Sequence, residues 1–317
     1  MSVRSLCTTL VLSVALAGVV VPTASARSTT YELPGDSGGS KYEGIGYDVR
    51  AQRFYVSETT GGEIHRGRLR SDAATEWLAG DGTDGRWTAR GVTVDARGRV
   101  YVAGGPNGID HPGAPDLWVY DRDGRLLAAL RTGVPNAFLN DLVIGPDGAA
   151  YVTNSNAPQV FRVAEHHGRW TIRTWADATT TIPTQTGFNL GGIVLSPDRS
   201  ALVVAQGNVG KLWRFSLRTG AVSAVDAGTA DLVNADGLVQ QGRTLWVVRN
   251  FSKVLSTLRL ASDGRSAQLV AATPTDPERV FTTAKLAQGR LLLVDSKFDE
   301  QVAAPPYQVV ALNPPRR

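Results

Sequence analysis

A short apolar segment recurs six times along this chain at intervals of 45 to 51 residues, and this repeat constrains the fold more than any other feature. Each copy leads through a turn into a second apolar segment, as residues 141–145 do through Pro146-Asp147-Gly148 into residues 149–153. Such turns suit tight hairpins. Four short strands in each repeat of this length are typical of one β-propeller blade. The copies begin at Gly44, Gly91, Asp141, Gly192, Gly237 and Ala284.

The strand pattern predicts an all-β fold, a six-bladed β-propeller with four-stranded blades. No stretch of residues 27–317 has convincing helical periodicity over 11 or more residues. The sixth repeat lacks one outer strand, because only Pro314-Pro315-Arg316-Arg317 follows its third. Residues 29–33 precede the first repeat and belong to no blade, so we expect them to supply the missing strand and close the ring without an open edge.

The first 26 residues predict a secretory signal peptide. Arg4 precedes an apolar run over residues 6–21, and Ala24-Ser25-Ala26 fits a cleavage site. The run is shorter than the ~20 residues that span a bilayer. We therefore expect residues 27–317 to form a single secreted domain without a membrane anchor after cleavage.

Composition excludes several classes of function. Cys7, the only cysteine, lies in the predicted signal peptide, so residues 27–317 contain no disulfide, thiolate nucleophile or cysteine metal ligand. These residues carry 32 basic and 29 acidic side chains, with no basic run of five or more. The charge pattern therefore predicts no nucleic-acid or membrane surface. The oligomeric state stays open.

The residues that precede the repeated apolar segments are the candidate site. The first strand of each blade lines the channel of a propeller, so these residues face one axis at one end. Two carboxylates and an amide meeting there repel one another unless a cation compensates them. Ligand sets made only of oxygens suit calcium or magnesium. The six residues are Glu43, Arg90, Asn140, Gly191, Asp236 and Thr283.

Several sequence segments together resemble the family of senescence marker protein, gluconolactonase and luciferin-regenerating enzyme. The resemblance covers essentially all of residues 27–317. It implies lactone ring opening with a bound divalent cation, for which we expect Ca²⁺ first and Zn²⁺ or Mg²⁺ as alternatives. The segments are residues 42–48 with 53–56, Asn140-Asp141-Leu142-Val143 with Pro146-Asp147-Gly148, residues 193–198, and Ala235-Asp236-Gly237-Leu238 with Leu245-Trp246-Val247.

The resemblance also implies roles for individual residues. Glu43 and Asp236 match metal ligands of the family, and Asp236 also matches the residue that positions or activates the attacking water. We expect Asn140 to join the metal set. Small-molecule lactone or ester substrate is expected to contact Arg90, Asn140, Asp141 and Asn189.

Two positions depart from the family pattern. The family usually has an asparagine ligand where this chain has Gly191, which offers no side-chain oxygen. Arg90 in the same ring carries a charge that could neutralise both carboxylates without a metal. Two hypotheses therefore remain: a metal-dependent hydrolase of a lactone or small ester, or a non-catalytic propeller that binds a ligand or protein. A condensing activity like that of strictosidine synthase is a distant third.

Other motifs carry less weight. His65, His111, His166 and His167 are not expected at channel-facing positions, and no Gly-x-Ser-x-Gly motif supports a serine nucleophile. Asn250-Phe251-Ser252 fits a glycosylation pattern.

Overall fold

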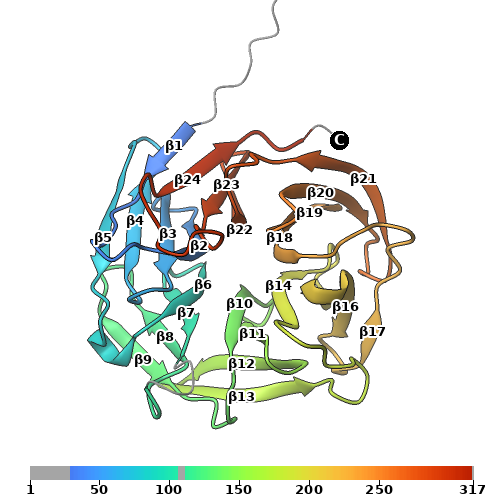
Figure 1. The fold of residues 1–317 in the computed structure, drawn as a ribbon. Helices are drawn as coiled ribbons and strands as arrows, with labels where there is room; N and C mark the ends of the chain where they lie inside the picture. The colour runs from blue at the N-terminus through green and yellow to red at the C-terminus, as the bar shows by residue number, and fades with distance from the viewer. Residues whose placement is uncertain (1–28, 106–110, 316–317) are drawn as a thin grey trace, which may run out of the picture.

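A computed structural model describes residues 29–105 and 111–315, and these residues form a six-bladed β-propeller. Six four-stranded antiparallel sheets are arranged in a ring around a central axis (Figure 1). Besides strands, the described ranges contain only two short 3₁₀ helices, η1 (Thr83–Gly85) and η2 (Gly207–Val209). The predicted all-β architecture is confirmed. The predicted signal peptide, residues 1–26, lies outside the described residues, and no helix within them has the length and hydrophobicity to cross a membrane.

In the first five blades the strands follow one another from the channel outward. The first three blades contain β2 (Tyr42–Asp48), β3 (Arg53–Glu58), β4 (Ile64–Arg68) and β5 (Ala74–Leu78); β6 (Ala89–Val94), β7 (Val100–Gly104), β8 (Leu117–Tyr120) and β9 (Leu126–Leu130); and β10 (Leu139–Ile144), β11 (Ala150–Asn154), β12 (Gln159–His166) and β13 (Arg169–Asp177). The next two contain β14 (Leu190–Leu195), β15 (Ala201–Gln206), β16 (Lys211–Ser216) and β17 (Val222–Ala224); and β18 (Ala235–Gln241), β19 (Thr244–Arg249), β20 (Val254–Leu260) and β21 (Ala267–Pro274).

The sixth blade closes the ring with strands from both ends of the chain. Its order is β22 (Phe281–Ala287), β23 (Arg290–Asp295), β24 (Gln308–Leu312) and β1 (Thr29–Glu32), with β1 outermost beside β24 (Figure 1). The two strands pair antiparallel from Thr29 opposite Ala311 to Glu32 opposite Gln308. The prediction that residues 29–33 supply the missing strand is therefore confirmed.

Burial falls from the inner strands to the outer ones. Every residue of β15 is buried, whereas every residue of β13 except Ala176 is exposed or partly buried. Inner strands are covered by neighbouring blades on both faces and so carry continuous apolar runs. The large aromatics Trp118 and Trp246 are 0% and 2% exposed in this inter-blade core.

All six innermost strands contain a register shift at the same place, near the channel end where they begin. In the first blade Glu43 and Gly44 together face Ser57, because Tyr42 pairs with Glu58 and Ile45 pairs with Val56. Such a bulge changes the direction in which a side chain points. The residues at the first bulge position are Glu43, Arg90, Asn140, Gly191, Asp236 and Thr282.

The sixth blade differs from prediction at this position. Its bulge lies between Phe281 and Ala284, so Thr282, and not Thr283, is equivalent to Glu43. The Thr282 hydroxyl is fully buried and donates to the Glu43 carbonyl at 2.9 Å. The Thr153 hydroxyl likewise donates to the Gly191 carbonyl at 2.8 Å. These bonds tie residues at the mouth of the channel to the neighbouring blade.

Glycine is required at the second bulge position in most blades, because the innermost strands approach closely there. A Cβ atom on Gly44 would lie 2.0 Å from the Arg90 carbonyl oxygen, and one on Gly192 would lie 2.3 Å from the Asp236 carbonyl oxygen. Both distances are far inside van der Waals contact. The recurring glycine of the sequence repeat therefore reflects contact between blades.

Candidate functional site

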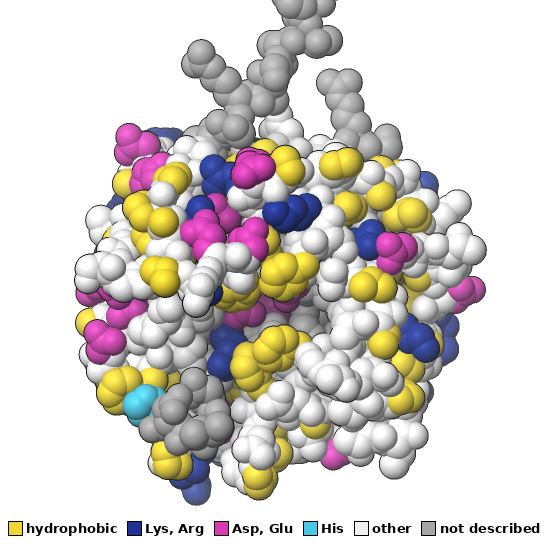
Figure 2. All heavy atoms as spheres, viewed as in Figure 1, with side chains coloured by type: hydrophobic (Ala, Val, Ile, Leu, Met, Phe, Trp, Pro, Cys, Tyr) yellow, Lys and Arg dark blue, Asp and Glu magenta, His cyan; other side chains and the backbone are white. Residues whose placement is uncertain are grey.

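A cavity of about 580 Å³ opens at the end of the channel where the innermost strands begin. Figure 2 shows a hollow at the centre of one face, with acidic side chains at its floor and hydrophobic side chains around it. Six residues are predicted to bind metal or substrate, and five of them line this cavity together with Gly191: Glu43, Arg90, Asn140, Asn189 and Asp236. The sixth, Asp141, borders a cavity of only about 10 Å³ that shares Glu43, Asn140 and Asp236.

Glu43 is a buried carboxylate with an unsatisfied oxygen. Glu43 is 8% exposed, and its Oε2 has no hydrogen-bond partner among the described residues. Burial raises the pKa of Glu43 well above its usual range, and the nearby Asp236 adds to the increase while Arg90 opposes it. A charged carboxylate in such a place needs a cation or a proton.

Asp236 is held by an amide that the sequence alone did not place at the site. Asn250 Nδ2 donates a hydrogen bond of 2.8 Å to Asp236 Oδ2. Burial raises the pKa of Asp236 to about 7, although this hydrogen bond lowers it. A carboxyl group with this pKa can accept and release a proton near neutral pH.

The Arg90 guanidinium contacts Gly104 and Phe138 and does not pair directly with the two carboxylates. Its Nη1 donates to the Gly104 carbonyl at 2.8 Å, and its guanidinium carbon lies 3.6 Å from the centre of the Phe138 ring. Within the described residues it forms no ion pair with Glu43 or Asp236 at 4.0 Å or less. Burial lowers the pKa of Arg90 to about 10, so it stays protonated at neutral pH. Its charge acts on Glu43 through space.

The mouth residues fit a hard divalent cation. Glu43, Asn140 and Asp236 all border both the mouth cavity and the small cavity beneath it, and all carry oxygen donors. The unsatisfied Glu43 Oε2 is the kind of atom that a cation would satisfy. Gly191 leaves room beside them, because a Cβ there would be 3.5 Å or more from its nearest neighbour, the Asp236 carbonyl oxygen.

Asn189 and Asp141 are engaged in internal hydrogen bonds. Asn189 Oδ1 accepts from the Gln185 amide at 2.8 Å and from Gln206 Nε2 at 3.1 Å, while its Nδ2 donates to the Gln185 and Gly187 carbonyls. Asp141 accepts from the amides of Leu142 and Ile193. Asn189 therefore shapes the rim of the cavity, and Asp141 belongs to the channel below it.

Sequence reasoning missed Asn250 and an aromatic rim. Asn250 directly follows β19, whose end lies at the mouth, and this position in the repeat is the signal that could have identified it. Phe188 and Phe251 are 63% and 54% exposed. The aromatic residues that line the cavity are Phe138, Phe188, Phe251 and Phe298.

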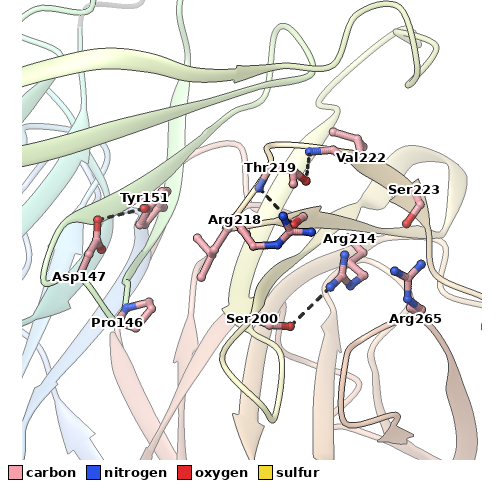
Figure 3. Close-up of a pocket in the computed structure, with 13 residues that line it drawn as sticks. Pro146, Asp147, Tyr151, Ser200, Arg214, Arg218, Thr219, Val222, Ser223 and Arg265 are labelled. Atoms are coloured by element: carbon pink, nitrogen blue, oxygen red, sulfur yellow. Dashed lines mark hydrogen bonds between the residues drawn. The ribbon is translucent and has the colours of Figure 1, made fainter.

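A second cavity, of about 680 Å³, lies by the turns at the opposite end of the channel (Figure 3). Arg214, Arg218 and Arg265 line it, and none of the predicted site residues does. Arg214 Nε donates to the Asp263 carbonyl at 2.6 Å, and Asp263 also pairs with Arg265 at 3.0 Å. Arg214 thus connects two turns and Arg265 pairs within its own turn, and the channel mouth remains the candidate site.

Comparison with solved structures supports the fold. A gluconolactonase from Xanthomonas campestris is 21% identical with a TM-score of 0.61, and 87% of each chain is covered. Regucalcin from Agrobacterium tumefaciens, a calcium-binding protein, is 17% identical with a TM-score of 0.59, covering 86% of this chain and 92% of that one. The Malassezia sympodialis allergen Mala s 1 is 15% identical with a TM-score of 0.64, covering 89% and 95%.

No curated protein matches the chain in sequence. The sequence pattern described as the SMP-30/Gluconolactonase/LRE-like region does match, over residues 42–277, which include every predicted site residue. This match spans five blades and both carboxylates of the mouth. The chain therefore belongs to the SMP-30/gluconolactonase/LRE-like family.

Proposed function

We propose that this protein is a secreted hydrolase that opens a lactone or a related small ester at the channel mouth. The observation that carries the proposal is the convergence of Glu43 and Asp236, two buried carboxyl groups with raised pKa values, on the floor of one cavity. Buried groups with perturbed pKa values in a cleft are typical of catalytic sites. Family membership supports the same reaction class.

Glu43, Asn140 and Asp236 would hold a divalent cation, with Ca²⁺ preferred over Zn²⁺ or Mg²⁺ because all the donors are oxygens. When bound, the cation supplies a Lewis acid for the substrate carbonyl. Asp236, held by Asn250, orients a water molecule and accepts its proton as the water oxygen bonds to the carbonyl carbon. The ring carbon–oxygen bond then breaks, and the proton passes to the leaving alkoxide.

Arg90 and the aromatic rim define the rest of the substrate. The protonated guanidinium at the cavity wall offers a fixed positive charge near the carboxylate that hydrolysis produces. The exposed rings of Phe188 and Phe251 leave apolar surface at the entrance. We infer that the substrate carries an apolar or aryl group that covers these rings, since a polyhydroxylated ring would leave them in contact with water.

Hydrolysis of a lactone panel tests the proposal. Alkyl- and aryl-substituted lactones and polyhydroxylated lactones are incubated with chelated protein and with added Ca²⁺, Zn²⁺ or Mg²⁺. Turnover is expected to lose 100-fold or more in Asp236→Asn, on the order of the contribution of a general base. The matched control is Asp72→Asn, an exposed carboxylate away from the cavity.

The non-catalytic alternative is favoured by one observation, the missing ligand at Gly191. If the protein binds apolar lactones without turning any over, under every cation, the hydrolase proposal is wrong and the binding propeller stands. Phe188→Ala separates substrate recognition from chemistry. It is expected to raise KM for aryl lactones and to leave kcat unchanged.

A further inference from the structure

A second acidic cluster lies outside the channel mouth. One carboxylate oxygen from each of Asp36, Glu58 and Glu63 lies within 4.8 Å of the other two. Asp36 belongs to the connection between β1 and β2, Glu58 ends β3, and Glu63 directly precedes β4. None of the three lines the mouth cavity. The cluster therefore joins the ring-closing segment to the first blade.

Glu63 gives an independent indication of a ligand. It is 6% exposed, and its Oε2 has no hydrogen-bond partner among the described residues. The nearby Arg86 does not satisfy it, because Nε donates to the Gly62 carbonyl, Nη2 to the Ala79 carbonyl and Nη1 to the Tyr120 hydroxyl. A buried carboxylate oxygen without a donor points to an additional positive group at this place.

The backbone holds the Glu63 carboxylate in position. A Cβ atom on Gly61 would lie 2.5 Å from Glu63 Oε2, and one on Gly80 would lie 2.1 Å from Glu63 Oε1. Two glycines thus leave the space that the carboxylate fills. The carboxylate is therefore packed closely against backbone at both glycines.

Glu58 is oriented in the same manner by hydrogen bonds. Its Oε1 accepts from the Thr60 hydroxyl at 2.5 Å, and its Oε2 lies 3.0 Å from Nε2 of His65, which is itself 2% exposed. A carboxylate oxygen with one hydrogen bond keeps a second lone pair for a metal. Partners of this kind orient metal-binding carboxylates in known sites.

We propose that Asp36, Glu58 and Glu63 bind a hard divalent cation, with Ca²⁺ preferred, that fastens the ring-closing segment to the first blade. The donors are all oxygens, as Ca²⁺ requires. Oxygens about 2.4 Å from one ion can be separated by up to about 4.8 Å, which agrees with the cluster. Only the connection between β1 and β2 links the closing strand to the first blade along the chain, so an ion on Asp36 restrains ring opening.

Calcium binding by the full chain tests this site separately from the mouth. Chelated protein carrying Glu43→Gln and Asp236→Asn, which disable the mouth, is titrated with Ca²⁺ in a calorimeter. We expect one equivalent to bind. Adding Asp36→Asn is expected to weaken binding about tenfold or more, because Ca²⁺ affinity depends on the number of charged ligands. Asp36 is exposed, so this variant preserves the fold, and the matched control Glu278→Gln, also exposed, is expected to bind like its parent.

Amide hydrogen exchange measures the proposed fastening. Ca²⁺ is expected to slow exchange in the connection between β1 and β2 of the mouth-disabled protein. In the same protein with Asp36→Asn added, Ca²⁺ is expected to leave the exchange rate of this connection unchanged. The site is refuted if the mouth-disabled protein binds no Ca²⁺, or if binding is equally tight after Asp36→Asn and Glu63→Gln. Neither outcome depends on hydrolysis, so this proposal and the proposed function fail or survive independently.

Discussion

Asp236→Asn is expected to stabilise the metal-free protein at pH 8 while it removes hydrolysis. Burial raises the pKa of this carboxyl from 3.8 to about 7 in the folded protein. In the unfolded chain the same group titrates near its ordinary value of about 3.9. The folded state therefore holds the proton more tightly, and ionisation of Asp236 at high pH opposes folding.

The sign and magnitude follow from this difference. A carboxyl with a raised folded pKa contributes stability that is fully present below about pH 4 and is lost as the pH rises through about 7. A shift of about three pKa units corresponds to about 4 kcal/mol. The asparagine amide cannot ionise, and its oxygen still accepts the hydrogen bond of Asn250. The variant therefore does not lose this stability at high pH. At about 2 °C per kcal/mol, the difference corresponds to about 8 °C in Tm.

Thermal unfolding in the presence of a chelator, between pH 4 and 8, measures the effect. The Tm of Asp236→Asn minus that of the wild type is expected to be near zero at pH 4 and to increase to about 8 °C at pH 8. Asp72→Asn, at an exposed position, is the control and is expected to show no such dependence. Added Ca²⁺ at pH 8 is expected to raise the Tm of the wild type more than that of the variant.

Two results would refute the reasoning. A difference in Tm that is the same at every pH would mean that ionisation of Asp236 does not oppose folding. A variant less stable than the wild type at pH 8 in chelator would mean that the carboxylate is already compensated within the protein.

Three further predictions concern the same end of the channel. Gly191→Asn is expected to tighten Ca²⁺ binding at the mouth about tenfold, because the position has room for a side chain and gains an oxygen ligand; unchanged affinity in calorimetry would contradict this. Asn250→Ala is expected to move the acidic limb of the pH–rate profile to higher pH, because the variant lacks the hydrogen bond that lowers the pKa of Asp236; a shift to lower pH would contradict this. Gly44→Ala is expected to destabilise the protein by about 2–3 kcal/mol in urea unfolding, because its Cβ would meet the Arg90 carbonyl oxygen; wild-type stability would show that the blades can separate there.

The fold was predictable because its determinants are local and repeated. Each blade is built from apolar segments and turns that are neighbours in sequence, and the count of strands shows that the last blade lacks one. Closure by β1 followed from that count, and its pairing with β24 confirms it. The convergence of Glu43, Asn140 and Asp236 was predictable for the same reason, since blade symmetry brings equivalent residues to one axis.

The details of the site depend on contacts that have no local signature. The bulge in β22 moves the equivalent position from Thr283 to Thr282, because pairing with β23 decides which residue is extra. The sequence suggested that Arg90 could neutralise the carboxylates. In the structure its guanidinium stacks on Phe138 and donates a hydrogen bond to the Gly104 carbonyl. These choices follow from packing between blades.

The sequence by itself therefore determined the number of blades, their closure and the ring of polar residues at one end of the channel. Only the tertiary structure decided which of those residues have free oxygens, which are engaged by other groups, and that Asp36, Glu58 and Glu63 meet. Hydrophobic periodicity depends on neighbours along the chain, whereas the hydrogen bonds and free energy of a buried polar atom depend on the segments that fold around it.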